Sequence, residues 1–319
     1  MKNVTFRQLK VFEAVARHLS FSRAAEELHL TQPAVSMQVR QLEQSAGLPL
    51  TEQVGRKVFL TTAGEELARH ARLIAQQLRE AEAAMDSLKG MRWGILKIGV
   101  VSTAKYFAPR LLALFRRNHP EVELKLSVLN RELVVQQLAE NEIDMAIMGR
   151  PPDEFETVAE PIADHPHIII ASPEHPLAGR HRVDPKALEA ETFLIREPGS
   201  GTRAAMERFF ATHSVVPRTT LVISSNETIK QAVMAGLGIS FLSAHTVGLE
   251  LATGRLVTLD VAGTPVIRRW HVVRRAEKRL LPVSEEFARF LVERGPELIA
   301  ELSRFDDLRA PRRSRDERG

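Results

Sequence analysis

The chain contains no cysteine among its 319 residues, which excludes disulfides, thiolate metal sites and cysteine nucleophiles. It has no apolar run that approaches the ~20 residues needed to cross a bilayer, so we expect no association with membranes. The opening segment, MKNVTFRQLK, has no apolar stretch behind its charges, and we expect no signal peptide. These absences together fit a protein of the reducing cytoplasm.

Motifs that carry catalysis are missing as well. Gly199-Ser200-Gly201 is not the G-x-S-x-G of a nucleophile elbow, and Gly236-Leu237-Gly238 follows an expected helix, which predicts a turn rather than a dinucleotide site. Without cysteine or an H-E-x-x-H helix, four histidines among prolines are predicted to be surface loop residues and not metal ligands: His165, His167, His175 and His181. We therefore expect no enzyme, no metal and no cofactor.

The charge balance is too even to identify a partner by itself. The net charge is +4, and 26% of the residues are charged, which is ordinary for a globular protein. Residues 1–64 hold eight Lys/Arg against five Asp/Glu, a difference of +3. This permits phosphate contacts, but only a motif can establish them.

The stretch from Phe21 to Ala46 predicts two short helices joined by a tight turn. Ser22 is expected to cap the first helix, and His29-Leu30 to form the turn. Thr31 is expected to cap the second helix, with Pro33 in its first turn. Four apolar residues of the second helix share one face: Val35, Val39, Leu42 and Ala46.

Polar side chains occupy the other faces of this second helix. Gln32, Ser36, Gln38 and Arg40 carry amide, hydroxyl and guanidinium groups, which read base edges in a DNA major groove. The alternative is an ordinary helical hairpin with a solvated face, since spacing alone does not separate the two.

A short β-hairpin is predicted over residues 54–60, with Arg56 and Lys57 near its tip. A hairpin that follows a helix-turn-helix is a wing, and Arg56 would suit a narrow A·T-rich minor groove. The alternative is a solvated turn arginine.

A long helix without Gly or Pro is predicted from Glu65 to Lys89. Its apolar residues alternate in steps of four and three, which is a heptad seam: Leu67, Ala71, Ile74, Leu78, Ala81, Met85 and Leu88. A second copy of this helix is the expected partner, and packing onto the downstream domain is the alternative. Residues 90–94 form a break before the next domain.

From Ile95 onwards, strands alternate with helices, which predicts parallel sheets with helices on both faces. The expected strands are Ile95–Val101, Val122–Leu129, Asp144–Met148, His167–Ala171, Thr192–Ile195, Thr220–Ser224, Ile239–Leu242 and Val266–Val273. The expected helices are 105–118, 131–141, 202–213, 226–236, 245–252 and 283–302. The late strand indicates two Rossmann-like lobes joined by crossover strands. The arginine-rich tail, 303–319, is predicted to be disordered.

These features resemble the LysR-type transcriptional regulators. The residues that carry the resemblance are Phe21-Ser22-Arg23-Ala24-Ala25, Leu30-Thr31-Gln32-Pro33-Ala34-Val35-Ser36, Leu42-Glu43, Gly47, Arg56 and Leu60-Thr61-x-Ala63-Gly64. Thr51 departs from the pattern, because the family usually carries Phe there, and looser packing under the wing is expected.

The resemblance implies the fold class α/β, with an all-α-dominated winged helix-turn-helix at 1–62. It also implies a linker and dimerisation helix at 63–90 and a bilobal, periplasmic-binding-protein-like effector domain at 91–302. Lobe one would comprise 91–161 and 267–302, and lobe two 162–266. The implied DNA-binding residues are Ser22, Arg23, Thr31, Gln32, Pro33, Ser36, Met37, Gln38, Arg40, Arg56 and Lys57, with Met37 suited to a thymine methyl group.

The effector is expected beyond the carboxyl ends of the strands, where ligands bind in open α/β sheets. Hydroxyls, glycines and cations at these ends suit a small anionic metabolite: Ser102, Thr103, Lys105, Asn130, Gly149, Arg150, Gly201, Thr202, Arg203 and Asn226. The alternatives are plain N-caps for the hydroxyl and amide residues, and ion pairs with acids for Arg150 and Arg203.

Three further segments resemble the CbbR-like regulators of Calvin-cycle (RubisCO) operons: 144–152, 196–203 and 225–233. This subgroup implies a homotetrameric activator of carbon-fixation genes that binds promoter DNA and can contact RNA polymerase. The implied effectors are a sugar phosphate, phosphoenolpyruvate, NADPH or ATP. The alternatives are a LysR-type regulator of another metabolic operon and a small-molecule-binding protein without DNA function.

Overall fold

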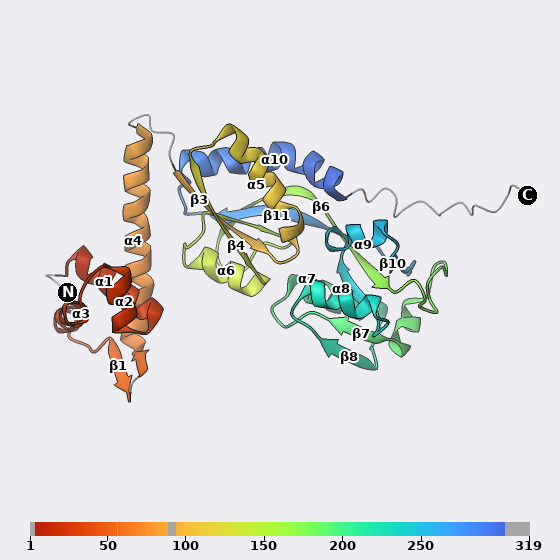
Figure 1. Cartoon of the computed structure of the whole chain (residues 1–319), viewed down its shortest axis with the longest axis horizontal. Helices are drawn as coiled ribbons and strands as arrows, with labels where there is room; N and C mark the ends of the chain where they lie inside the picture. The colour runs from red at the N-terminus through yellow and green to blue at the C-terminus, as the bar shows by residue number, and fades with distance from the viewer. Residues whose placement is uncertain (1–3, 56, 89–93, 304–319) are drawn as a thin grey trace, which may run out of the picture. The chain divides into compact units, whose positions relative to one another are not determined.

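The computed structural model describes residues 4–55, 57–88 and 94–303. These residues form two compact units, one built from α1 to α4 and the other from β3 to α10 (Figure 1). The expected break at 90–94, apart from Gly94, and the expected tail, apart from Ser303, lie outside the described residues, as does Arg56.

The N-terminal unit is a small helical domain with a two-stranded wing. Its elements are α1 (Phe6–His18), α2 (Phe21–Glu27), α3 (Gln32–Ala46), β1 (Thr51–Val54), β2 (Lys57–Leu60) and α4 (Thr62–Leu88). Phe12, Val35 and Leu42 are completely buried where α1 and α3 meet. The strands β1 and β2 pair antiparallel, as the predicted hairpin requires.

The caps of the helix-turn-helix differ in part from the prediction. Ser20, not Ser22, caps α2: its hydroxyl accepts a hydrogen bond from the backbone N–H of Arg23 at 3.3 Å. Ser22 was therefore assigned wrongly as the cap, because α2 begins one residue before it. Thr31 occupies the N-cap position of α3, but its side chain makes no capping hydrogen bond. His29 lies in the turn with φ 53°.

Helix α4 begins three residues before the predicted start, because the hydroxyl of Thr61 accepts a hydrogen bond from the N–H of Gly64 at 3.0 Å. The predicted heptad seam is divided. Leu67 and Ala71 pack into the core of their own N-terminal unit. Four of the later seam residues are exposed: Ile74, Leu78, Ala81 and Met85. The side chain of Leu88 lies outside the described residues.

The C-terminal unit has two lobes. Lobe one contains β3 (Gly94–Val101), η1 (Ala104–Tyr106), α5 (Ala108–Asn118), β4 (Val122–Leu129), α6 (Arg131–Ala139), β5 (Met145–Met148) and, at the end of the chain, α10 (Pro282–Ser303). Lobe two contains η2 (Pro185–Ala190), β7 (Thr192–Ile195), α7 (Gly201–His213), β8 (Thr219–Val222), α8 (Asn226–Met234), β9 (Ser240–Ser243), η3 (Ala244–Thr246), α9 (Gly248–Ala252) and β10 (Val257–Thr258).

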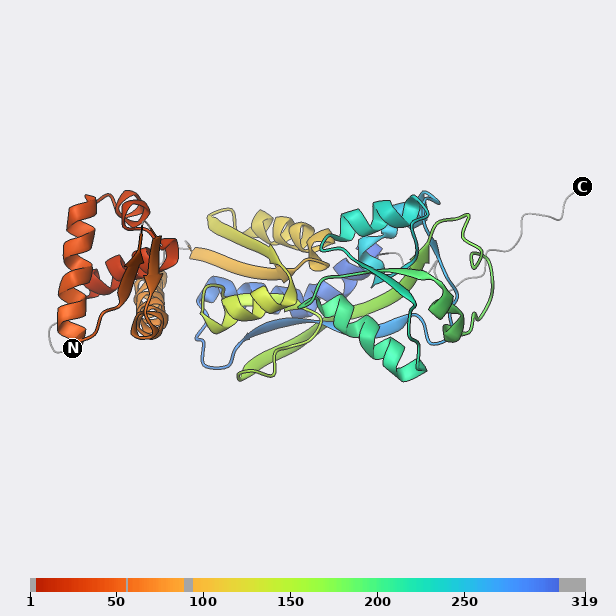
Figure 2. The same cartoon turned by 90° about the horizontal axis from the view of Figure 1, so that it is seen from below.

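Two long strands connect the lobes: β6 (Thr157–Ala171) leads out and β11 (Val266–Arg275) leads back. They pair antiparallel from Val266↔His167 to Arg275↔Thr157. The predicted change of lobe at 161–162 thus falls inside a continuous strand, and the one at 266–267 at the start of another. Figure 2 shows the two lobes at either end of these strands.

The sheet is mixed, whereas parallel sheets were predicted. Strand order is β10-β6-β11-β5-β3-β4, with β9 also paired to β6. The parallel prediction is correct for β3 with β4 and β5, and for β7 with β8. It is wrong for β6, β9, β10 and β11, which pair antiparallel. For β6 and β11 the reason is that the chain crosses between the lobes in opposite directions.

The core of lobe one surrounds Trp270, Phe107 and Phe287, and α10 packs onto it. Lobe two has apolar clusters on both faces of its strands. Within the described ranges, no helix combines the length and the apolar composition needed to cross a membrane. In the same ranges, no three His, Asp or Glu side chains gather as metal ligands would.

Candidate functional site

The outer face of the helix-turn-helix presents nearly all of the predicted DNA-binding side chains. Eight are exposed: Ser22, Arg23, Thr31, Gln32, Pro33, Met37, Arg40 and Lys57. Ser36 and Gln38 are half-buried, and the Gln32 amide donates a hydrogen bond to the Ser36 hydroxyl at 3.1 Å. The structure thus brings these residues onto α3, the start of α2 and the wing, while Arg56 lies outside the described residues.

The base of the wing is held by Glu43 on α3. One carboxylate oxygen of Glu43 accepts hydrogen bonds from the backbone N–H of Leu50 at 2.9 Å and of Thr51 at 3.1 Å. The hydroxyl of Thr51 donates to the same oxygen at 3.2 Å. These three hydrogen bonds tie the start of β1 to α3, at the position where the resemblance to LysR-type regulators implies an aromatic ring.

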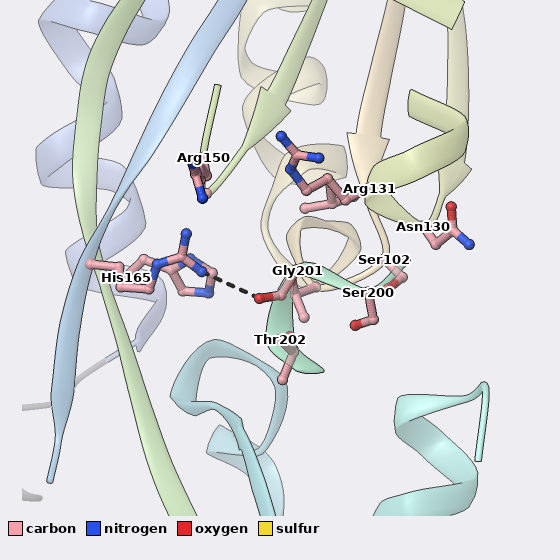
Figure 3. A pocket seen from close by; sticks show the side chains of 12 residues that line it. Ser102, Asn130, Arg131, Arg150, His165, Ser200, Gly201 and Thr202 are labelled. Carbon is pink, nitrogen blue, oxygen red and sulfur yellow. Dashed lines mark hydrogen bonds between the residues drawn. The ribbon is translucent and has the colours of Figure 1, made fainter. Parts of the chain in front are cut away.

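A cleft of about 390 Å³ lies between the two lobes of the C-terminal unit. Lobe one contributes the segments that follow β3, β4 and β5, and lobe two contributes the N-terminus of α7. The long strands contribute the rest. Of the predicted effector residues, seven line it: Ser102, Thr103, Asn130, Gly149, Arg150, Gly201 and Thr202 (Figure 3).

The cleft is strongly cationic. Arg131, Arg150 and Arg268 line it, and no carboxylate does so among the described residues that form its wall. Arg268 donates a hydrogen bond to the carbonyl of Gly201 at 3.3 Å. Burial, together with the charges of Arg150, Arg131 and the nearby Arg208, lowers the pKa of Arg268 to about 10. An anion in the cleft would relieve this accumulation of positive charge.

Several polar residues of the cleft also cap helices, as the alternative interpretation allowed. The Ser200 hydroxyl accepts from the N–H of Arg203 at 3.5 Å, and Asn130 Oδ1 accepts from the N–H of Leu133 at 2.9 Å. Thr103 and Thr202 are buried in the wall of the cleft. The Thr103 side chain does not cap η1, and Ser200, not Thr202, caps α7. The N-terminus of α7 adds backbone N–H groups that favour negative charge.

Three predicted effector residues do not line this cleft. Lys105 lies 5.2 Å from the ring of Tyr106, and Asn226 is buried and accepts a hydrogen bond from Arg196. Arg203 pairs with Glu207 at 2.8 Å and lines an adjoining hollow. Among the cleft residues, Arg150 pairs with Asp153, so both arginines have the acidic partners that the alternative proposed.

Val101, Arg131 and Ser200 also line the cleft and adjoin predicted residues, whereas two further residues were missed because they come from the long strands. His165 on β6 and Arg268 on β11 both line the cleft. The prediction that His165 and His167 are surface loop residues is wrong: both are buried in β6. The alternation of side chains between the two faces of a predicted crossover strand was the signal that could have identified them.

A second polar cluster joins the lobes beside the cleft. Buried Arg196 in lobe two bonds to Glu197 at 2.7 Å and donates to the hydroxyl of Ser102 in lobe one at 3.2 Å. Tyr106 in lobe one donates a hydrogen bond to Glu227 in lobe two. A ligand in contact with Ser102 would therefore affect a hydrogen bond between the two lobes.

Comparison with known proteins places this geometry in a family. Residues 6–65 match the bacterial regulatory helix-turn-helix protein, lysR family, and residues 89–296 match the LysR substrate binding domain. The HTH-type transcriptional regulator CbbR of Rhodospirillum rubrum is 55% identical over 285 residues, 89% of this chain and 95% of that protein. The RuBisCO operon transcriptional regulator of Allochromatium vinosum is 51% identical over 300 residues, 94% of this chain and 99% of that protein.

A solved structure gives the same assignment for the C-terminal unit. The CcmR regulatory domain of Synechocystis PCC6803, determined in complex with 2-PG, is 41% identical, with a TM-score of 0.61. The match covers 64% of this chain and 99% of the CcmR domain. With both units matched and relatives that extend over most of its length, this chain belongs to the LysR family of helix-turn-helix transcriptional regulators.

Proposed function

We propose that this chain controls a RubisCO operon in response to a small phosphorylated metabolite that binds in the cleft between its lobes. The observation that carries the proposal is the lining of the cleft: three arginines and several hydroxyls from both lobes, with no carboxylate in the described wall. The names of the relatives support the operon, and the CcmR domain in complex with 2-PG (2-phosphoglycolate) supports the ligand class.

The mechanism is a shift between arrangements of the two lobes. A ligand that contacts Ser102 and Arg131 in lobe one and Thr202 in lobe two stabilises the arrangement in which these groups converge. Because two long strands carry the chain between the lobes, the relative tilt of the lobes is the coordinate that such a ligand biases. In an oligomer, this tilt would move the paired DNA-reading units.

The proposed DNA-reading surface is the exposed front of α3 with the wing. Gln32→Ala is expected to remove about 1–3 kcal/mol of base discrimination if the Gln32 amide contacts a base in two places. Fluorescence anisotropy with the protein's own promoter and with a scrambled duplex measures this difference. Gln44→Ala is the matched control, since Gln44 is also exposed on α3 but lies near the opposite end. Unchanged discrimination in Gln32→Ala contradicts the proposed contact.

The exposed part of the seam on α4 is the proposed dimer contact. Leu78→Asp would place a charge in this apolar stripe, and sedimentation is expected to show weaker self-association with the helical content retained. Leu249→Asp is the control, because Leu249 is an exposed leucine on α9, outside the stripe. Equal self-association of both variants would argue against the stripe.

The ligand is tested by calorimetric titration of the full chain with 2-phosphoglycolate, a sugar phosphate, phosphoenolpyruvate, NADPH and ATP. Saturable heat with at least one of them is expected. No heat with any of them overturns the proposed effector class. Binding without any effect on a RubisCO promoter would instead favour control of another metabolic operon.

A further inference from the structure

His165 is a buried polar side chain of the cleft. It lies on β6, is 3% exposed and lines the cleft. Neither ring nitrogen has a hydrogen-bond partner among the residues that the structure describes. Figure 3 shows its ring close to the hydrogen bond that ends on the carbonyl of Gly201. Buried polar groups without partners are rare, and they cost free energy unless a ligand satisfies them.

The ring of His165 is fixed from several sides. It stacks on Trp270 with the ring centroids 3.7 Å apart and the planes at 15°. A Cβ on Gly149 would lie 3.0 Å from its Nδ1, so the absence of a side chain at Gly149 makes room for the ring. His165 therefore has little freedom to turn away and find a partner elsewhere in the core.

The titratable and charged groups around this ring are basic. His167 faces it from β6 and Arg268 from β11, while His245 faces it from η3. Arg150 follows Gly149 in the same wall. Burial, strengthened by His167, His245 and Arg268, lowers the pKa of His165 well below its usual range. Without a bound anion the imidazole is therefore neutral at neutral pH, with one donor and one acceptor.

We propose that His165 contacts the anionic group of the effector directly, and that one proton enters the cleft together with the ligand. This inference rests on the proposed binding of a phosphorylated metabolite in the same cleft. The contact satisfies one ring nitrogen by a hydrogen bond with a phosphoryl oxygen. The proton is carried either by the ring, as imidazolium, or by a phosphoryl oxygen that donates to the ring. Both forms hold the same number of protons.

The electrostatics explain the uptake. Burial, together with His167, His245 and Arg268, disfavours a positive charge at His165 in the absence of a ligand, whereas a dianion placed against the ring favours that charge. A phosphate monoester is dianionic in solution above its second pKa of about 6. Above that pH, affinity is therefore expected to fall about tenfold per pH unit for one proton taken up.

Calorimetry of the full chain with 2-phosphoglycolate tests this. The titration is repeated near neutral pH in two buffers of different ionisation heat, with wild type, His165→Asn and the control His181→Asn, whose ring is exposed. Wild type and the control are expected to take up about one proton. His165→Asn should take up none and bind about tenfold to a hundredfold more weakly. Equal affinity and equal proton uptake in His165→Asn overturn the inference.

A second variant guards against a folding defect. His165→Phe keeps a ring over Trp270 but removes both nitrogens, so its midpoint of thermal unfolding without ligand should equal or exceed that of wild type, while binding weakens. Unimpaired binding by a folded His165→Phe also overturns the inference. Failure of wild type to bind any phosphorylated metabolite would instead remove the proposed function, so the two failures are distinguishable.

Discussion

Replacing Arg268 by methionine tests whether the cleft is built around an anion. The guanidinium is largely buried, and burial with the charges of Arg208, Arg150 and Arg131 lowers its pKa from 12.5 to about 10. This shift in pKa means that the charged guanidinium is roughly 3 kcal/mol less favourable in the folded chain than in the unfolded chain. Methionine loses the hydrogen bond to the carbonyl of Gly201, which contributes about 1 kcal/mol. The free energy of unfolding of Arg268→Met should therefore exceed that of wild type by about 1–2 kcal/mol.

Urea unfolding of the two proteins without ligand measures this difference, and calorimetry with 2-phosphoglycolate measures the cost to binding. The matched control is Arg269→Met, on the next residue of β11, where the side chain is 64% exposed and pairs with Asp164 at 3.3 Å. That substitution should change stability by no more than about 0.5 kcal/mol. If Arg268→Met is less stable than wild type and binds the metabolite equally well, Arg268 is a structural anchor and the reasoning is refuted.

Two further predictions concern stability. Gly64→Ala should destabilise the N-terminal unit by about 1–3 kcal/mol or more, because a Cβ there would lie 1.9 Å from the carbonyl oxygen of Leu50; an unchanged melting temperature would contradict this. His167 is buried and His245 is mostly buried, which lowers the pKa of each to about 3. Neither histidine should affect the free energy of unfolding above pH 6.5, the pKa of an unfolded histidine. Below that pH, each should lower the free energy of unfolding by about 1.4 kcal/mol per pH unit, because only the unfolded chain takes up the proton. A free energy of unfolding in urea that stays constant between neutral and mildly acidic pH would argue against neutral histidines.

The long strand β6 shows where sequence patterns stop being informative. Only its last five residues were predicted as a strand, because Pro161 and Pro166 interrupt the earlier part. Proline lacks the N–H that an interior strand donates. Residues 157–166 pair with β11 on one side, whereas β9 and β10 pair with β6 only from His167 onwards. The prolines therefore lie where the strand has one neighbour, and a missing donor is tolerated.

The linker helix shows a second limit. Heptad spacing correctly predicted a long helix with an apolar stripe, but spacing does not identify what covers the stripe. Leu67 and Ala71 are used by the core of the N-terminal unit, and only the later seam residues remain exposed. The division depends on the packing of α4 against α1, which is a tertiary contact between segments far apart in the sequence.

Only part of the cleft was predictable from the sequence. The rule that ligands lie beyond strand ends located Ser102, Gly149 and Thr202, since these residues follow strands or begin a helix. It did not locate His165 or Arg268, because they lie within strands that cross between the lobes. Their convergence follows from the antiparallel pairing of β6 with β11, which the alternation of strands and helices did not reveal.

The most direct test of metabolite-controlled DNA reading is footprinting of the full chain on its own promoter, with and without 2-phosphoglycolate, for wild type and Arg268→Met. We predict specific protection by both proteins, and a change in the extent of protection on adding the metabolite for wild type alone. A footprint of wild type that the metabolite leaves unchanged, at concentrations that calorimetry shows to be saturating, would contradict control of DNA binding through the cleft.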